Sequence, residues 1–406
     1  MSDKIKDYIV ITTFALIIFG TLLINTITPD STVSKSERKS LQQFPKIAWS
    51  IILEKGDDAK PISVKKRVDT FSKEIKKFTK DFETYASDQF VGRDAYRRLK
   101  ASIVFNVFRH SDNNDIYIAE GQASKYISKV NDAAINMIIK GYNHVYNTML
   151  KDGPNVYFSI IPDKNYFIAE ENGYPSIDYE AFVNKFKTEL NSNIKYIDLF
   201  DSLSIGDYYA TDIHWRQEKI EDVVNKLAAE MDFETGNAQY TENKLEGFYG
   251  VYYGQSALPM SSEELIYYTP NNDGITVRLL NEQYSAQGIT KFEEVEMYNL
   301  EKYIREDPYD IFLHGPKQLI VIENENASSN RELVIFRDSF TSSLAPLLVE
   351  SYSKITLIDL RYIANIFITD EMVQFKENQD VLILKSVEVL NSGSIKFIDE
   401  NGKLIK

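Results

Sequence analysis

Two short segments of the sequence carry side chains that can act together in chemistry. Asp212 and His214 lie two residues apart within the segment TDIHW, and Ser339 follows an apolar stretch within the segment RDSF. A serine hydroxyl is a weak nucleophile until a neighbouring base takes its proton, and a histidine oriented by a carboxylate is such a base. The two segments therefore contain the nucleophile, base and orienting acid of a serine hydrolase or acyltransferase.

The choice of base is narrow, because the chain has only four histidines. His110 and His144 fall in or at the end of helical patterns and have no paired carboxylate at a useful spacing. His314 lies in a Gly-Pro turn. We interpret these three as packing, surface or structural residues, which leaves His214 as the candidate base.

Each segment also has a simpler interpretation. An Asp or Ser immediately before a helix is a common N-cap, and RDSF by itself favours that reading. An Asp-x-His pair can also supply two metal ligands, or it can form a surface turn before a helix that starts near Trp215. A metal site needs more ligands, and the sequence has neither a His-Glu-x-x-His motif nor a cluster of carboxylates and histidines. We therefore expect no metal.

The elements around the two segments predict an α/β fold. From about residue 116 onward, short apolar runs alternate with amphipathic helical patterns, which is typical of buried parallel strands joined by right-handed crossovers. The predicted strands are residues 156–161, 196–199, 333–336, 355–360 and 381–384, and the predicted helices are residues 133–150, 179–190, 218–231 and 342–352.

This arrangement predicts where the chemistry takes place. Ser339 would lie at the carboxyl edge of the sheet, where α/β proteins place ligands, and N–H groups at the start of the next helix can stabilise an oxyanion. In an extended segment, Asp212 and His214 would point to the same side. Residues 248–310 break the alternation, and 266–268 with 275–279 predict a β-hairpin within an insertion.

The N-terminal region predicts a membrane anchor followed by a linker and helices. Tyr8–Ile27 carries no charge and has about the ~20 residues that a membrane-spanning helix needs. It exceeds the ~7–15-residue apolar core of a signal peptide and ends in no small-x-small cleavage site, so we expect an uncleaved anchor in residues 1–30, with the N-terminus in the cytoplasm. Residues 31–110 read as a linker and helical region, and 111–406 as the α/β domain. An apolar stripe over residues 64–85 predicts a helix that packs on its own domain or pairs in a coiled coil.

Composition excludes several classes of function. The net charge of -14 and the pI of about 5.0 argue against binding to nucleic acid, which needs a basic face. The absence of cysteine excludes disulfides, thiolate zinc sites and a cysteine nucleophile. A hydrophobic content of 43% with 26% charged residues is that of an ordinary globular protein.

Several motifs together resemble the DHHW protein family. TDIHW looks like the T-D-x-H-W signature of that family, and RDSF with the residues after it, 342–348 and 358–362, is similar to it as well. Tyr252-Tyr253-Gly254 and Pro162-Asp163-Lys164 add to the resemblance. The family is similar in turn to the SGNH-hydrolase-like acetyltransferases that modify alginate, in which Asp-x-His precedes the serine. The order of a triad along the chain varies between folds.

The resemblance implies an SGNH-hydrolase-like sheet and assigns roles to the three residues. Ser339 would be the nucleophile, His214 the general base and Asp212 its orienter. Two positions depart from the pattern: Ile213 replaces the first His of the family's name, and Arg337 stands where SGNH enzymes have Gly. Arg337 is thus a weak candidate for contact with the substrate.

The oxyanion donors of SGNH enzymes are harder to place on this chain. The backbone N–H of Ser339 remains available to the expected mechanism. Gly254 and Asn165 are weak candidates for the Gly and Asn donors, and for both we favour a turn or structural role.

The function implied is O-acetyl transfer to a cell-surface polysaccharide outside the cytoplasmic membrane. No cofactor is expected, since acetyl-CoA is absent there, and a membrane-bound O-acyltransferase would supply the acyl group. One alternative is a carbohydrate esterase with the same triad, because transferase and esterase differ in how water and acceptor compete for the acyl-enzyme. The other is a non-catalytic glycan-binding or assembly protein, for which an aromatic content of 13% would supply stacking surfaces.

Overall fold

The computed structural model describes residues 3–34, 37, 39–47, 64–235, 239–305 and 307–405. Within the predicted linker, residues 48–63 lie outside this description. The chain divides into two compact units, Met1–His110 and Ser111–Lys406. We describe each unit by itself.

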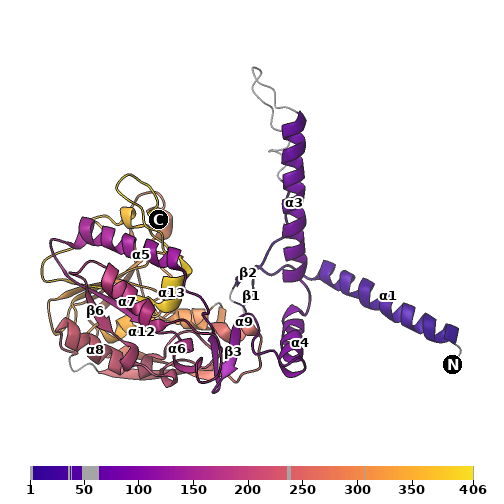
Figure 1. Ribbon diagram of the computed structural model, residues 1–406, viewed down its shortest axis with the longest axis horizontal. Coiled ribbons are helices and arrows are strands. Elements are labelled where there is room, and N and C mark those ends of the chain that lie inside the picture. The colour runs from indigo at the N-terminus through magenta and orange to yellow at the C-terminus, as the bar shows by residue number, and fades with distance from the viewer. Residues whose placement is uncertain are drawn as a thin grey trace. The chain divides into compact units, whose positions relative to one another are not determined.

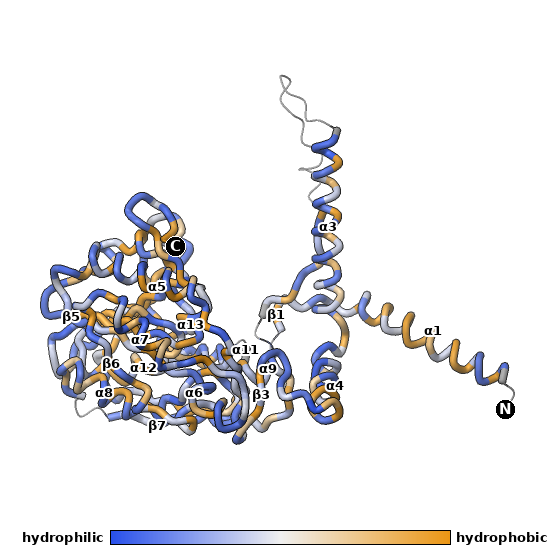
Figure 2. The backbone as a smooth tube through the Cα atoms, viewed as in Figure 1, coloured by the Kyte–Doolittle hydropathy of each residue, from blue (hydrophilic) through white to orange (hydrophobic). Residues whose placement is uncertain are grey.

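The first unit begins with helix α1 (Asp3–Ile27), which is hydrophobic along most of its length (Figure 2). Its stretch Lys4–Ile27 is long and apolar enough to cross a membrane, and none of its apolar window is buried. A signal sequence near an N-terminus would have the same properties. The anchor therefore stays a prediction.

The rest of the first unit is built on two helices, α3 (Val64–Asp88) and α4 (Arg93–Asn106), with the short antiparallel pair β1 (Val33–Ser34) and β2 (Lys39–Ser40). The apolar stripe predicted over residues 64–85 lies on α3. The ring of Phe44 packs edge-on against three aromatic rings of this stripe, those of Phe78, Phe82 and Tyr85. Part of the stripe is thus covered within its own unit.

The second unit is an α/β arrangement in which helices surround a central sheet (Figure 1). This sheet has eight strands in the order β10-β9-β11-β13-β12-β14-β5-β6. Its strands are β5 (Asn155–Ile161), β6 (Lys195–Asp198), β9 (Ile275–Leu280), β10 (Phe292–Val295), β11 (Leu319–Asn324), β12 (Glu332–Phe336), β13 (Lys354–Ile358) and β14 (Asp380–Ser386). The neighbours from β13 through β6 are all parallel, whereas β11, β9 and β10 are antiparallel additions. The predicted α/β class with a mostly parallel sheet is confirmed.

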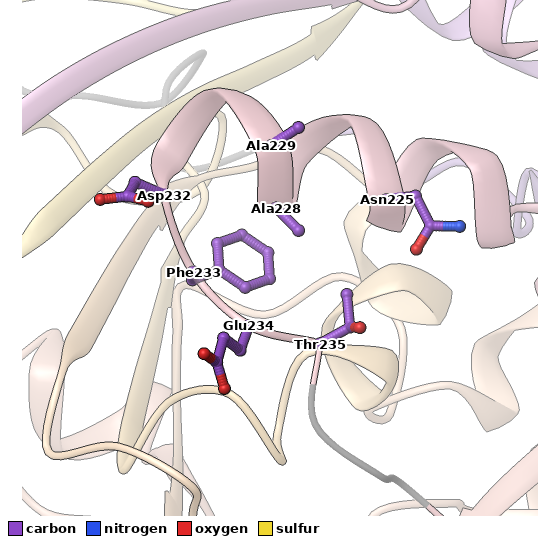
Figure 3. A pocket seen from close by; sticks show the side chains of 7 residues that line it. All are labelled: Asn225, Ala228, Ala229, Asp232, Phe233, Glu234 and Thr235. Carbon is purple, nitrogen blue, oxygen red and sulfur yellow. The ribbon is translucent and has the colours of Figure 1, made fainter.

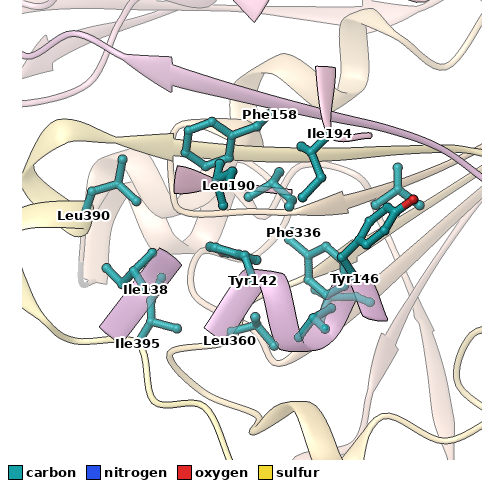
Figure 4. Packing of buried hydrophobic residues seen from close by; sticks show 14 of the residues in the cluster. Ile138, Tyr142, Tyr146, Phe158, Leu190, Ile194, Phe336, Leu360, Leu390 and Ile395 are labelled. Atoms are coloured by element: carbon teal, nitrogen blue, oxygen red, sulfur yellow. The ribbon is translucent and has the colours of Figure 1, made fainter. Parts of the chain in front are cut away.

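Helices cover both faces of this sheet, because its central strands are apolar on both sides. Val334 and Phe336 of β12 pack with helices α5 (Asp132–Val145), α7 (Tyr179–Glu189) and α13 (Val387–Ser392). Figure 4 shows the aromatic centre of that layer, where Tyr142, Phe158 and Phe336 meet. The alternate residues Leu333 and Ile335 face the other layer, which contains α8 (Glu221–Met231) and the segment after Ser339. Continuous apolar strands are what a sheet buried on both faces requires.

Two short antiparallel pairs lie outside the main sheet. Strands β3 (Ile116–Ala119) and β4 (Gln122–Lys125) form one pair, and β7 (Tyr240–Phe248) and β8 (Glu263–Pro270) form the other. Two short helices, α6 (Lys164–Ile168) and α9 (Val251–Ser256), follow β5 and β7 respectively.

The predicted hairpin of residues 266–268 and 275–279 is wrong. The first segment lies in β8 and pairs with β7, and the second lies in β9 and pairs with β10 and β11. The turn between them carries the chain from one sheet to the other, and the side chain of Asn272 accepts a hydrogen bond from the N–H of Gly274 within it. The predicted insertion therefore contributes two strands to the main sheet.

The predicted helix 342–352 is also wrong in its length. Helix α12 spans only Thr341–Leu344, and a 3-10 turn, Ala345–Leu347, follows it. Pro346 explains the break, because proline has no N–H to donate and its ring clashes with the preceding turn of an α-helix.

Candidate active site

The structure brings Asp212, His214 and Ser339 into one hydrogen-bonded chain. His214 Nδ1 lies 2.6 Å from Asp212 Oδ1, and His214 Nε2 lies 2.8 Å from Ser339 Oγ. Asp212 is fully buried and His214 is 7% exposed. Each side chain thus touches the next in the order that acid, base and nucleophile require. Because both side chains are buried, the alternative interpretation of this pair as a surface turn is wrong.

The base and the acid sit on one tight turn, and the extended conformation predicted for this segment is wrong. Asp212 Oδ1 accepts a hydrogen bond from the backbone N–H of His214 at 3.0 Å as well as contacting Nδ1. One carboxylate oxygen therefore fixes both the turn and the imidazole. With Nδ1 as the donor to Asp212, Nε2 is the acceptor that faces Ser339, which is the tautomer a general base needs.

The second oxygen of Asp212 is held by α9. Asp212 Oδ2 accepts the N–H of Val251 at 2.7 Å, and the N–H of Gly250 donates to Thr211 Oγ1 at 2.9 Å. A Cβ built on Gly250 would lie 2.3 Å from Asp212 Cβ. The backbone before α9 thus approaches the turn more closely than any side chain permits.

Two further charged residues hold the turn in place. Glu263 accepts hydrogen bonds from the N–H groups of Ala210 and Thr211 at 2.8 and 2.9 Å. Lys164 Nζ donates to the carbonyl oxygens of Tyr209 and Asp212 at 2.7 and 3.2 Å. Burial lowers the pKa of Lys164 to about 7, but its carbonyl acceptors match the donors of an ammonium group.

The serine is positioned by contacts from the same turn. Trp215 Nε1 donates to Phe340 O at 3.1 Å and to Ser343 Oγ at 2.9 Å. On the other side, Asp338 Oδ2 accepts from the N–H and the hydroxyl of Ser386 at 2.7 and 2.8 Å. The residues flanking Ser339 are therefore bonded to Trp215 on one side and to the end of β14 on the other. Neither Asp338 nor Ser339 caps α12, whose N-cap is Phe340.

An aromatic ring lies flat on the imidazole. The ring of Tyr309 stacks on His214 with 3.8 Å between centroids and 4° between planes, and its hydroxyl lies 2.8 Å from Ser343 Oγ. The ring of Phe340 contacts His214 from another direction, at 4.9 Å. The imidazole is thus fixed by packing as well as by its hydrogen bonds.

Two of the three weaker candidates, Gly254 and Asn165, form hydrogen bonds with other residues of the fold. The N–H of Gly254 donates to Gly250 O inside α9. Asn165 Oδ1 accepts from the hydroxyl of Tyr117 at 2.9 Å, and its amide donates to Pro175 O. Their roles in substrate binding stay predictions.

Arg337 is fully buried beneath the serine. Its guanidinium donates to Ser342 Oγ and to Gly315 O at 2.6 and 2.9 Å. Burial lowers the pKa of Arg337, and burial likewise lowers that of Lys385, which donates to Arg337 O, to about 8. A side chain so placed supports the strand end. A contact between Arg337 and the substrate stays a prediction.

The other histidines lie in different surroundings. His314 Nε2 is 2.8 Å from Glu296 O and its Nδ1 is 3.0 Å from Asn299 Nδ2, and burial lowers its pKa. His144 lies 3.8 Å from an exposed carboxylate, that of Glu400. Within the described ranges, no three His, Asp or Glu side chains cluster as metal ligands.

A cavity of about 540 Å³ lies at the end of α8 (Figure 3). Arg331, which precedes β12, donates to the carbonyl oxygens of Met231 and Asp232 beside it. The cavity therefore lies at the amino edge of the parallel strands, whereas Ser339 follows their carboxyl edge.

Sequence reasoning missed several residues that build the site. Gly250 lies 38 residues beyond Asp212, and Tyr309 lies 95 residues beyond His214. No local motif marks either residue. Lys164 lay within the segment Pro162-Asp163-Lys164, which carried part of the resemblance but no assigned role. Its position directly after a buried strand was the available signal.

No protein-family model matches the sequence, and no curated protein matches it. Solved structures share its fold. A DHHW family protein from Eubacterium siraeum DSM 15702 aligns with 18% identity and a TM-score of 0.53, over 69% of this chain and 93% of that one. Bacillus cereus PatB1 aligns with 21% identity and a TM-score of 0.53, over 68% of this chain and 97% of that one, and it has also been solved with a sulfonyl adduct.

The predicted resemblance to the DHHW family is therefore confirmed as a likeness of fold. The O-acetyltransferase domain of Pseudomonas putida AlgJ also aligns, with 11% identity and a TM-score of 0.41 over 71% of this chain and 95% of that one.

Proposed function

We propose that this protein is a serine-dependent O-acetyltransferase that acts on a polysaccharide through an acyl-enzyme. The observation that carries the proposal is the buried chain of hydrogen bonds from Asp212 through His214 to Ser339. Its place at the carboxyl edge of a parallel sheet adds support, since α/β proteins bind ligands there.

The proposed reaction has two steps. Ser339 Oγ attacks the carbonyl carbon of an acetyl ester while His214 Nε2 takes its proton, and the ester bond to the donor breaks as the proton passes to the departing alkoxide. A sugar hydroxyl then attacks the acetyl-serine, gives its proton to His214, and restores Ser339 as the serine oxygen leaves and is reprotonated. The backbone N–H of Ser339 is our candidate donor to the oxyanion.

The test is intact-mass analysis of the full chain in detergent after incubation with 4-nitrophenyl acetate. We expect one acetyl group on the wild type, mapped to Ser339, and none on Ser339→Ala. Ser261→Ala is the matched control, because Ser261 is an exposed serine elsewhere in the same unit. Absence of the adduct in the wild type, with no release of nitrophenol, would contradict the acyl-enzyme.

A sulfonyl fluoride offers a second test that does not depend on turnover. PatB1, which has the same fold, has been solved with a sulfonyl adduct. We expect such a reagent to label Ser339 in this protein and to block acetylation. Labelling at another residue with activity retained would show that Ser339 is not the nucleophile.

We also propose that α1 anchors the protein, with the second unit outside the cytoplasmic membrane and a membrane-bound acyltransferase as the acyl supplier. The support is the length and composition of Lys4–Ile27. Removal of residues 1–30 should abolish modification of the cell-surface glycan and spare cleavage of 4-nitrophenyl acetate. Full modification by the truncated protein would refute the anchor's role.

A further inference from the structure

A small polar cavity lies on the side of the triad where α9 and α13 begin. Its volume is about 220 Å³, which suits one sugar ring better than a longer chain. Its lining combines two carboxylates, an ammonium group and two tyrosine rings, those of Asp163, Glu388, Lys125, Tyr126 and Tyr252. No role in the reaction above uses these side chains.

Chain connections place this cavity next to the reacting groups. Asp163 is adjacent to Lys164, whose Nζ binds Asp212 O, and Tyr252 is adjacent to Val251, whose N–H binds Asp212 Oδ2. Glu388 lies in α13, whose N-cap Ser386 is bonded to Asp338. Three lining residues of the cavity are thus one or two residues from a group that contacts Asp212 or Asp338.

One carboxylate oxygen in this wall has no partner among the described residues. Asp163 is 5% exposed, and its Oδ1 accepts from the hydroxyl of Tyr179 at 2.7 Å and the N–H of Tyr166 at 3.2 Å. Its Oδ2 is buried and accepts no hydrogen bond from the rest of the described structure. A buried polar atom is costly unless it is bonded, so this oxygen is suited to form a hydrogen bond with a hydroxyl group of a ligand.

The second carboxylate is more open. The side chain of Glu388 is 34% exposed and lies 3.9 Å from Lys125 Nζ, a long ion pair between partly exposed groups. Burial among its neighbours raises the pKa of Glu388, while the charges of Lys125 and His214 oppose that rise, so Glu388 is within electrostatic range of the base. When both carboxyl groups are ionised, the two carboxylates and one ammonium give the wall a formal charge of -1.

From this geometry we infer that the cavity binds the acceptor, and that the acceptor unit is an uncharged pyranose whose hydroxyls donate to Asp163 and Glu388. The tyrosine rings supply the apolar walls that sugar rings pack against. A uronic acid is disfavoured, because its carboxylate would face an acidic wall in a chain of net charge -14. This inference rests on the proposed function and names the substrate class of the same site.

The experiment compares two acceptors of opposite character with the full chain in detergent. The probes are an N-acetylglucosamine tetrasaccharide, which is uncharged, and a mannuronate tetrasaccharide, which is anionic, with 4-nitrophenyl acetate as the acetyl donor. Release of nitrophenol without acceptor is measured first, because it reports acylation of Ser339 and so tests the proposed function separately. Acetylated sugar is then measured by mass spectrometry.

We expect the wild type to acetylate the uncharged probe in preference to the anionic one. In Glu388→Gln the KM for the uncharged probe should be about ten times the wild-type value, because a hydrogen bond to a charged acceptor is lost. The KM for the ester should stay at its wild-type value. Asp163→Asn keeps the helix-capping oxygen and should raise the same KM. Glu371→Gln, at an exposed turn, is the matched control.

Two results would overturn the inference while the acyl-enzyme stands. One is an equal KM for the uncharged probe in the wild type and in both variants, and the other is a preference for the mannuronate probe. If the wild type releases no nitrophenol, the proposed function fails instead. Calorimetric titration with the uncharged probe then tests whether the cavity binds a sugar. Equal heats of binding for wild type and Glu388→Gln would then refute it.

Discussion

Replacement of Gly250 by alanine tests whether the close approach of α9 to the turn that carries Asp212 and His214 controls the proposed activity. Gly250 has φ -85° and ψ 176°, which any residue adopts, so backbone strain plays no part. The added methyl carbon would lie 2.3 Å from Asp212 Cβ and 2.4 Å from its Cα and N. Ordinary carbon contacts are about 3.5 Å, so the two segments must separate by roughly 1 Å.

That displacement acts on the acid of the triad. The bond from Val251 N–H to Asp212 Oδ2 is 2.7 Å long, and a lengthening of roughly 1 Å takes it beyond hydrogen-bond range. Loss of a hydrogen bond to a charged group costs about 1.5–3 kcal/mol. A misplacement of about 1 Å at a catalytic group can lower the rate about 10²-fold.

The assay is kcat for 4-nitrophenyl acetate, with the midpoint of thermal unfolding measured alongside. Gly206→Ala is the matched control, because its methyl carbon would meet nothing closer than Ser204 Oγ at 3.7 Å. We expect a large loss of kcat and a lower midpoint for Gly250→Ala only. Wild-type values of both quantities in Gly250→Ala would show that the reasoning about this contact is wrong.

Three other substitutions test separate parts of the site. Asp212→Asn should lower kcat about 10⁴-fold while the protein stays folded by circular dichroism, because the amide favours the wrong tautomer of His214. Tyr309→Phe should keep kcat, since the ring still stacks on His214. Its free energy of unfolding in urea should fall by about 1 kcal/mol, because the hydrogen bond to Ser343 is lost. Tyr309→Leu should lower kcat. Burial raises the pKa of Asp163 to about 7 from 3.8, so the folded state holds a proton that the unfolded state releases between these pH values. Stability of the wild type should therefore fall as pH rises from about 4 to 7, and urea unfolding of Asp163→Asn should lack this fall, a difference of at most about 4 kcal/mol.

The sequence predicted the parallel half of the sheet well and the antiparallel half poorly. Residues 333–336 and 381–384 are apolar throughout. Such continuous apolar runs are typical of strands that are buried on both faces. Strand β7 alternates irregularly because it contains a bulge between Leu245 and Phe248, so its pairing with β8 left no clear local pattern.

The candidate site divides in the same way. Asp212, His214 and Ser339 were identifiable because their types and spacing imply chemistry. Gly250 and Tyr309 were not identifiable, because their roles depend on contacts with distant residues. Gly250 contacts Asp212, 38 positions away, and Tyr309 contacts His214, 95 positions away. Such contacts exist only in the folded chain. The tight turn at Asp212 was likewise hidden, since an Asx turn and an extended segment share one sequence pattern.

The position of β14 in the sheet has a consequence for how the protein acquires activity. This strand joins β12 on one side to β5 on the other, although β5 is more than 200 residues earlier. Among the strands of the described residues, no other one links those two parts of the sheet. Such distant pairings form late in folding. Until residues 380–386 pair, β12 and β5 both expose an open edge, and Asp338 lacks its bonds to Ser386. We therefore expect catalysis to appear only when synthesis has passed Ser386, so that ester cleavage by a nascent chain would report completion of the sheet.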